Sequence, residues 1–245
     1  MEITYAISTS KGDRGHNEDY ALAGRNGDVC CFVVADGLGG HGKGEVASKL
    51  VCETVMQMAS RQNQGASGQV SLEEMFGQAQ DELMELQRRE GARDAMKTTL
   101  NVLLADAAAI RWGHVGDTRT YYFRKHKLVS RTKDHSVPQM MVSMGEIREA
   151  EIRHHPDRNR LLRVMGIPWT SPQYALEKEL KPQKGQAFCM CTDGFWEYIE
   201  DREMKKCLKA AGSVQEWLDA MNQVVRQRGA GQDMDNYTAL AVWIR

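Results

Sequence analysis

The sequence has little proline, no excess of one charge and no long hydrophobic run. Five prolines and 22 glycines in 245 residues are too few for a collagen-like or low-complexity chain. The 32 Lys and Arg residues nearly balance the 33 Asp and Glu residues, which leaves a net charge of -1. Because nucleic-acid binders carry a general positive field, this balance predicts no nucleic-acid partner. We expect one globular domain over residues 1–245, with two smaller domains as the alternative.

The chain also lacks the marks of a membrane or secreted protein. Met1–Tyr5 has no basic segment followed by an apolar one, and no apolar stretch approaches the length of a membrane span. The six cysteines lie mostly inside apolar runs and form no C-x-x-C pair. This pattern predicts buried, reduced thiols, a cytoplasmic location and no membrane partner.

Hydrophobic periodicity divides the chain into blocks of strands and blocks of helices. It predicts strands at 3–8, 20–23, 30–35, 98–104, 108–115, 120–124, 128–131, 174–180, 187–191 and 237–243. It predicts helices at 45–60, 71–89, 201–211 and 214–228, and a charged helical segment at 136–163 with breaks at Gly145 and Pro156. The short connections between residues 108 and 131 require antiparallel hairpins. This order predicts an α+β fold with two antiparallel sheets and helices outside them.

A glycine-rich segment, Asp36–Gly44, lies between an expected strand and an expected helix. It matches G-x-G-x-x-G, but the second parallel strand that a dinucleotide site requires is missing. It also matches the first part of a P-loop, although Gly44 stands where a Ser or Thr should bind magnesium. A P-loop-like nucleotide hydrolase is therefore a disfavoured alternative.

Carboxylates recur where expected strands begin or end. Five positions share this pattern, and they are Glu18-Asp19, Asp36, Asp117, Asp193 and Asp235. Each alone is typical of a turn. Together they could converge at one edge of an antiparallel core, where they would repel one another unless cations lay between them. Oxygen ligands favour hard ions such as Mg²⁺ or Mn²⁺.

Seven short segments, which include all of these carboxylates, follow one another along the chain. They are Arg14–Asp19 (RGHNED), Val34–His41 (VADGLGGH), Val115–Arg119 (VGDTR), Thr132–Ser136 (TKDHS), Asn159–Gly166 (NRLLRVMG), Cys191–Trp196 (CTDGFW) and Asp235–Thr238 (DNYT). In type and order they resemble the motifs of the metal-dependent serine/threonine protein phosphatases of type 2C, the PPM family, in their compact bacterial form. The resemblance runs nearly end to end.

The resemblance implies a fold, a reaction and a set of roles. The implied fold is an antiparallel β-sandwich with α-β-β-α layers and a small helical flap at about 135–170. The implied reaction is hydrolysis of phosphoserine and phosphothreonine by water activated at two Mg²⁺ or Mn²⁺ ions, with a weaker third ion. The implied substrates are phosphoproteins made by a Ser/Thr kinase, and the chain is expected to be a monomer.

The same resemblance assigns the site residues by position. Asp36 and the Gly37 carbonyl would bind the two central ions, Asp193 and Asp235 would bind one of them, and Glu18 would act through water. Asp117 and Asp193 would hold the third ion. Arg14 would bind the substrate phosphate, for which a guanidinium is well shaped. His41 is a candidate general acid, with a metal-bound water as the alternative.

Two departures from the family pattern remain. Ala95–Thr99 replaces G-x-G-T-T, so we expect a local change of backbone geometry without loss of metal. The charged stretch 146–163 is either a solvated surface or a selector of acidic or phosphorylated substrates. A catalytically weak phosphatase-like domain that binds a regulatory partner is the alternative from another class, and the presence of Asp36, Asp193 and Asp235 disfavours it.

Overall fold

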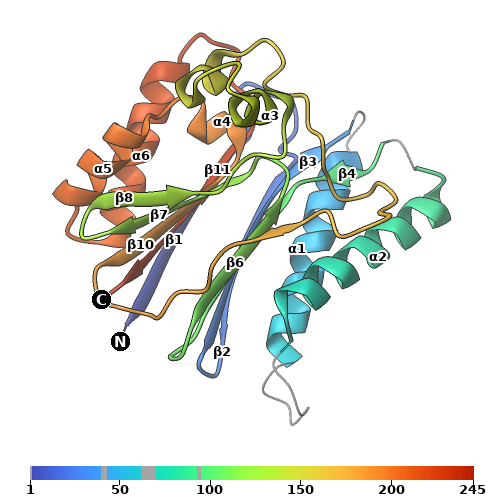
Figure 1. Cartoon of the computed structure of the whole chain (residues 1–245), viewed down its shortest axis with the longest axis horizontal. Coiled ribbons are helices and arrows are strands. Elements are labelled where there is room, and N and C mark those ends of the chain that lie inside the picture. The colour runs from blue at the N-terminus through green and yellow to red at the C-terminus, as the bar shows by residue number, and fades with distance from the viewer. Residues whose placement is uncertain (1, 40–42, 62–69, 93–94) are drawn as a thin grey trace.

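The computed structural model describes residues 2–39, 43–61, 70–92 and 95–245, which form four layers in the order helices, sheet, sheet, helices (Figure 1). The predicted α+β sandwich is therefore confirmed. Within the described residues, no helix combines the length and the apolar character needed to cross a membrane.

Both sheets are antiparallel. The first has the strand order β1 (Ile3–Ser10), β11 (Tyr237–Ile244), β10 (Gln186–Cys191), β7 (Arg119–Arg124) and β8 (Lys127–Arg131). The second has the order β2 (Asp19–Asn26), β3 (Val29–Leu38), β5 (Leu100–Ala105), β6 (Ile110–Val115) and β9 (Ala175–Leu176), and the short strand β4 (Lys97–Thr98) pairs with β3.

Helices cover the outer face of each sheet. The second sheet carries α1 (Lys43–Arg61) and α2 (Leu72–Glu90), and the first carries α5 (Asp201–Ala210) and α6 (Val214–Gly229). The flap contains α3 (Val137–Met144) and the 3₁₀-helix η1 (Glu149–His154), and the one-turn helix α4 (Asp193–Trp196) follows β10. Helix α2 begins with a capping box, in which Ser71 and Glu74 each accept a hydrogen bond from the other's main-chain N–H.

The core lies in three layers because each sheet is covered on both faces. Between the sheets, Phe32 and Trp112 of the second sheet meet Phe188 and Leu240 of the first. Separate clusters fill the space between each sheet and its helices. Strands that are buried on both faces have no solvent-exposed face that needs polar residues, which explains why β3 and β10 are largely continuous apolar runs.

Two local predictions differ from the structure. Residues 174–180 do not form one strand, because Ala175 and Leu176 pair with one end of β6 and Leu180 forms an isolated bridge with Ile110 at its other end. The segment 136–163 has the predicted breaks, since Gly145 ends α3 with a φ of 78° and η1 ends before Pro156, but residues 157–163 are not helical.

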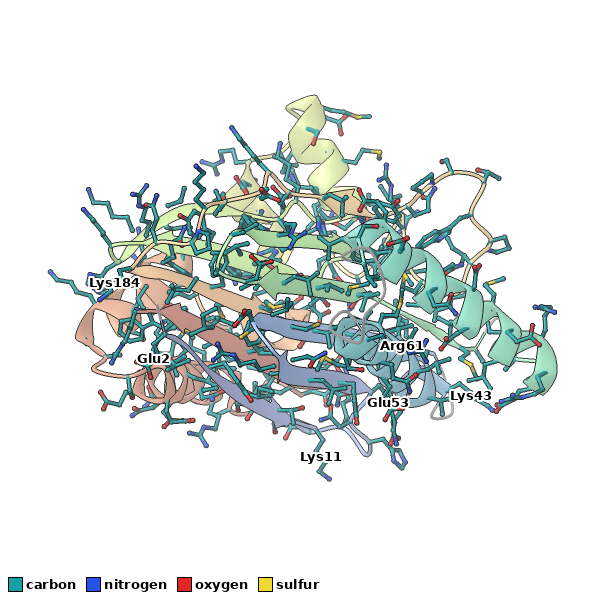
Figure 2. All side chains as sticks on the ribbon, turned by 90° about the horizontal axis from the view of Figure 1, so that it is seen from below. Glu2, Lys11, Lys43, Glu53, Arg61 and Lys184 are labelled. Carbon is teal, nitrogen blue, oxygen red and sulfur yellow. The ribbon has the colours of Figure 1, made fainter. Side chains whose placement is uncertain are left out.

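Many side chains with nitrogen or oxygen ends project from the surface in the view of Figure 2. Lys11 and Lys184, for example, are exposed and project outward in that view.

Candidate metal centre

Antiparallel pairing gathers the predicted carboxylates at one end of the first sheet. At the end of β10, Cys191 lies opposite Arg119, where β7 begins, and opposite Ala239 near the start of β11. Asp193 follows β10, while Asp117 and Asp235 precede β7 and β11 by two residues. The register therefore brings these three positions to one edge, although they are far apart in the sequence.

The second sheet supplies the remaining groups by the same rule. Asp36 near the end of β3 lies opposite Asp19 at the start of β2. The Gly37 N–H donates to the Glu18 carbonyl over 3.0 Å, which fixes Glu18 beside the end of β3.

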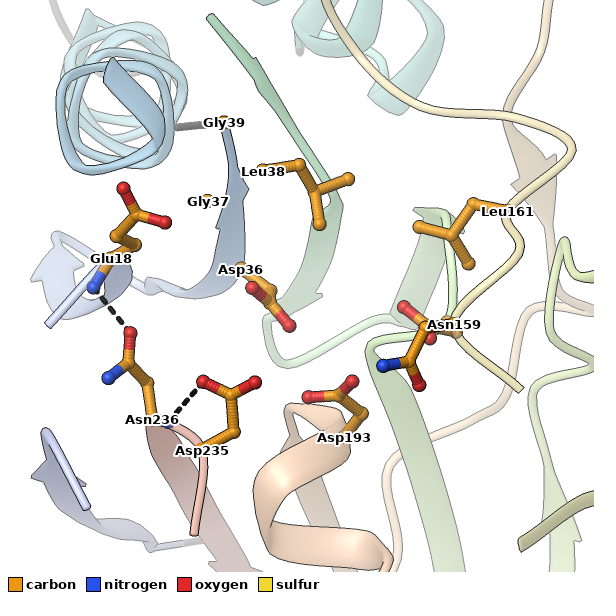
Figure 3. A pocket seen from close by; sticks show the side chains of 11 residues that line it. Glu18, Asp36, Gly37, Leu38, Gly39, Asn159, Leu161, Asp193, Asp235 and Asn236 are labelled. Atoms are coloured by element: carbon orange, nitrogen blue, oxygen red, sulfur yellow. Dashed lines mark hydrogen bonds between the residues drawn. The ribbon is translucent and has the colours of Figure 1, made fainter. Parts of the chain in front are cut away.

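These residues surround one cavity of about 250 Å³. It is lined by Glu18, Asp36, Gly37, Leu38, Gly39, Asp117, Asn159, Leu161, Asp193, Asp235 and Asn236. In Figure 3 the carboxylates of Asp36, Asp193 and Asp235 point toward a common space between the strand ends. All six predicted metal-binding positions thus lie around the same cavity.

The cavity raises the proton affinity of its carboxylates. Desolvation and the charge of Asp193 raise the pKa of Asp36 and of Asp117 well above the usual range of a carboxyl group. Desolvation and the charge of Glu197 raise the pKa of Asp193 to about 7. Carboxylates so placed ionise together only when cations balance them.

The main chain of Asp36 is held from both sides by two threonines. Thr98 donates its hydroxyl to the Asp36 carbonyl over 2.7 Å, and the Asp36 N–H donates to the Thr99 hydroxyl over 2.8 Å. The Thr99 hydroxyl also shares a hydrogen bond of 2.6 Å with Thr118, next to Asp117. Thr99 therefore connects the two turns that present Asp36 and Asp117. Residues 95–99 adopt no positive φ.

Glycine is required where the glycine-rich segment meets its neighbours. A Cβ at Gly37 would overlap the Gly44 carbonyl, and a Cβ at Gly39 would overlap the Ala95 carbonyl. A Cβ at Gly44 would lie 2.8 Å from the Gly37 carbonyl carbon and 3.0 Å from Glu18 Oε2. The Ser or Thr of a P-loop therefore does not fit at position 44, which argues against the nucleotide-hydrolase alternative.

Arg14 lies beside the cavity and is bound to one of its carboxylates. Its Nε and Nη2 atoms donate to Asp235 over 3.1 and 3.2 Å, and Nη1 is 3.7 Å from Asp233. The hydrogen bond with Asp235 raises the pKa of Arg14. The Arg14 side chain is 47% exposed, so its guanidinium is accessible to a ligand from solvent.

Two supporting residues were not predicted as part of the site. Asn236 accepts the Glu18 N–H over 2.7 Å and donates to the carbonyls of Lys11 and His16, so it holds the loop that carries Arg14 and Glu18. Trp196 Nε1 donates to the Asp117 carbonyl over 3.1 Å. The D-N motif and the Trp of the T-D-G-F-W segment were the available signals for these two roles.

Asp19 supports the site from outside the cavity. It is buried, accepts the Thr192 hydroxyl over 2.8 Å, and has a pKa raised to about 8 by desolvation. His41, the candidate general acid, lies outside the described residues.

The donor set fits hard divalent ions. Among the described residues, no three His, Cys, Asp or Glu side chains form a ready-made site for a single ion. The carboxylates instead surround a shared cavity and present only oxygen. Mg²⁺ and Mn²⁺ suit such a site, because they bind through few carboxylates and keep part of their water.

Comparison with known proteins gives matches over nearly the whole chain. The model of the protein phosphatase 2C family matches residues 11–238. The serine/threonine phosphatase stp of Listeria monocytogenes serotype 4b is 28% identical over 238 residues, which are 94% of this chain and 90% of that protein. The phosphatase PstP of Mycobacterium tuberculosis is 26% identical over 241 residues, which are 98% of this chain and 45% of that longer protein.

Solved structures agree with this assignment. The crystal structure of M. tuberculosis PstP/Ppp has a TM-score of 0.86 at 26% identity and covers 99% of both chains. The PstP catalytic domain in complex with two manganese ions has a TM-score of 0.81 at 24% identity, with 99% of this chain and 98% of that chain covered. With the family match over residues 11–238, we conclude that this chain belongs to the protein phosphatase 2C family, the metal-dependent serine/threonine protein phosphatases.

Proposed function

We propose that Asp36, the Gly37 carbonyl, Asp193, Asp235 and, through water, Glu18 hold two Mg²⁺ or Mn²⁺ ions. Asp117 and Asp193 hold a weaker third ion. The observation that carries the proposal is the convergence of these six positions on one cavity of about 250 Å³. The manganese ions in the PstP complex support a divalent cation as the cofactor.

The reaction is the hydrolysis of a phosphoserine or phosphothreonine ester in a protein substrate. When bound, the ions activate a water for in-line attack on phosphorus and balance the charge of the phosphoryl oxygens. Arg14 orients the phosphoryl group by donating two N–H groups of its guanidinium to phosphoryl oxygens. As the oxygen of water bonds to phosphorus, the bond to the serine or threonine oxygen breaks, and that oxygen takes up a proton.

The source of that proton distinguishes two versions of the proposal. His41 supplies it in one version, and a water ordered near Asp117 supplies it in the other. Asp117 lines the cavity in which the substrate phosphate and water would meet, which favours the second version.

The proposal extends to the setting of the enzyme. The substrates are the products of a Ser/Thr kinase, and the chain acts as a cytoplasmic monomer. All six cysteines are free thiols and five of them are buried, which is typical of a protein in a reducing compartment. Light scattering on the purified chain tests the monomer directly.

Chelation tests the proposed function. Phosphate release from a phosphothreonine peptide should cease after exhaustive chelation and return when Mn²⁺ is added, while Zn²⁺ alone should substitute poorly. Turnover that persists in the chelated protein would refute a metal-dependent reaction.

A further inference from the structure

A second and larger cavity, of about 830 Å³, lies between β8, η1 and α5. We call it the β8–η1–α5 pocket. It is lined by Arg119, Leu128, Val129, Ser130, Arg131, Lys133, Glu149, Ala150, Arg153, His154, Glu200, Asp201, Arg202 and Lys205. Six of these residues are Lys or Arg and three are acidic, so the wall carries a local positive excess in a chain of nearly neutral charge.

Part of this positive charge is already paired within the protein. Arg119 forms an ion pair of 2.6 Å with Asp134, Arg131 one of 2.5 Å with Glu149, and Arg202 one of 2.8 Å with Glu200. Arg153 and Lys205 form no ion pair within 4.0 Å with any residue that the structure describes. These two cations are therefore available to a ligand.

Arg153 is the more informative of the two. Its Nη1 atom is buried and has no hydrogen-bond partner among the described residues. A buried donor without a partner costs free energy, so it marks a position where an acceptor would be favourable. Its guanidinium lies 5.7 Å from the Trp196 ring, on which Arg119 stacks at 3.5 Å.

The strand beside these cations has a free edge. β8 is the last strand of the first sheet, and among the described strands it pairs only with β7. An extended peptide can add to such an edge through main-chain hydrogen bonds. Val129, at 57% exposure, offers an apolar contact on the same strand. A free strand edge beside unpaired cations favours a peptide over a nucleic acid as the ligand.

The pocket adjoins the metal centre. Asp117 lines the first cavity, and Arg119, two residues later, lines the second. Figure 1 shows β8 and α5 on the same side of the molecule, with the flap above them.

We propose that the β8–η1–α5 pocket binds an extended acidic segment of the phosphoprotein substrate, with its carboxylates or phosphates contacting Arg153 and Lys205. This assignment of a substrate segment rests on the proposed function. The Glu149 side chain is 60% exposed and its carboxylate forms an ion pair with Arg131, so Glu149 competes with the acidic segment for this guanidinium.

The binding test uses the full chain in chelator, where no hydrolysis takes place. Fluorescence anisotropy follows a labelled eight-residue peptide rich in Asp and Glu at low salt. The combined substitutions Arg153→Gln and Lys205→Gln should weaken binding about tenfold. Lys206→Gln is the control, because it removes an exposed charge from α5, the helix that carries Lys205, outside the pocket; it should leave peptide binding unchanged. Glu149→Gln should strengthen peptide binding severalfold.

The kinetic test compares two phosphothreonine peptides, one with an acidic tail and one with a neutral tail. The unsubstituted enzyme should show a lower KM for the acidic peptide, and the Arg153→Gln/Lys205→Gln enzyme should lose that preference while its turnover of an aryl phosphate stays unchanged. A preference that survives the double substitution would overturn the proposal. Acidic-peptide binding that withstands the double substitution would overturn it too. If the double variant failed to fold, acidic-peptide binding that is unchanged in Lys205→Gln alone would overturn it.

The remaining outcomes distinguish an acidic peptide from other ligands, and the pocket proposal from the proposed function. Inorganic phosphate binding as tightly as the peptide, or a short single-stranded RNA binding more tightly, would overturn the peptide assignment. Absence of acidic-peptide binding in an active phosphatase would overturn the pocket proposal and leave the proposed function intact. Pocket-dependent peptide binding by a chain without phosphatase activity would support the peptide site and contradict the proposed function.

Discussion

Asp117 is held in the wall of the metal centre through its main chain. Its carbonyl accepts the Trp196 indole N–H, and its buried side chain lines the cavity. Asp117→Ala should keep the two central ions and lower kcat on a phosphothreonine peptide by at least about tenfold to a hundredfold, the scale for supporting groups around a metal. An aryl phosphate should lose less, because its leaving group needs little protonation. Steady-state kinetics on both substrates measures the difference.

The control for Asp117 is another carboxylate that caps a turn. Asp106 accepts the N–H groups of Ala108 and Ala109 and pairs with Arg111. Asp106→Ala should lower the melting temperature and affect both substrates alike. If Asp117→Ala behaved in the same way, Asp117 would be a turn residue and not a ligand of a third ion.

Arg14 tests whether phosphate binding and metal binding are separate. Arg14→Ala should raise KM about fivefold to tenfold, a discounted value for a charge-assisted contact at a half-exposed site. Manganese should still bind, because the substitution removes a competitor from Asp235. Titration calorimetry with Mn²⁺ measures this binding, and its loss in the variant would contradict the role given to Arg14.

A stacked pair of histidines links stability to pH. The rings of His114 and His135 lie 4.6 Å apart, and burial lowers the pKa of His114 and lowers that of His135 to about 3. Because unfolded histidine has a pKa of about 6.5, the unfolded chain binds more protons below that pH, and stability falls as pH drops from about 6.5 toward 3.

The substitution His135→Gln removes one of these two titrating side chains. The melting temperature of the variant in chelator should therefore depend less on pH between about 6.5 and 4.5 than that of the unsubstituted chain. Scanning calorimetry across this range measures both slopes. Equal slopes would show that His135 has the same proton affinity in the folded and unfolded chain.

At the scale of elements, Thr99 connects the ends of two strands. Its buried hydroxyl contacts the Asp36 N–H and the Thr118 hydroxyl, so it joins the turn after β3 to the turn before β7. The substitution Thr99→Val keeps the shape of the side chain and removes both of its hydrogen bonds. We expect a loss of about 1–3 kcal/mol in stability and about tenfold to a hundredfold weaker manganese binding.

Thr4→Val in β1 is the matched control, since among the described residues the Thr4 hydroxyl makes a single long hydrogen bond, 3.4 Å, to the Trp243 carbonyl. The stability of this variant, measured by chemical denaturation, and its manganese affinity, measured by titration, should equal those of the unsubstituted chain. Manganese affinity that is also unchanged in Thr99→Val would show that the two turns are positioned independently.

Strand ends and caps were predictable from the sequence where the signal is local. The capping box at Ser71 and the strands before Asp36 and Asp193 follow from residue type and period. The flap was less predictable, because its path depends on tertiary contacts such as the ion pair between Arg131 and Glu149. The prediction of one strand over residues 174–180 was wrong, because a mixture of apolar and charged residues does not specify which of them reach a sheet edge.

At the scale of the whole molecule, the layered fold was predictable and the positions of the site residues were not. The block order of strands and helices indicated two covered sheets. Register decides which strand ends meet, and it is set by long-range pairs such as Cys191 with Arg119, which no local pattern contains. The family motifs supplied the site residues, whereas Asn236, Thr99 and the β8–η1–α5 pocket needed the folded chain.

The central claim is that the strand-end carboxylates hold a divalent metal centre. A crystal of the chain grown with Mn²⁺ and measured for anomalous scattering tests it most directly. The account predicts two strong peaks in the cavity, within about 2.0–2.3 Å of carboxylate oxygens of Asp36, Asp193 and Asp235. An empty cavity at saturating manganese, or ions bound only at other surfaces of the molecule, would contradict it.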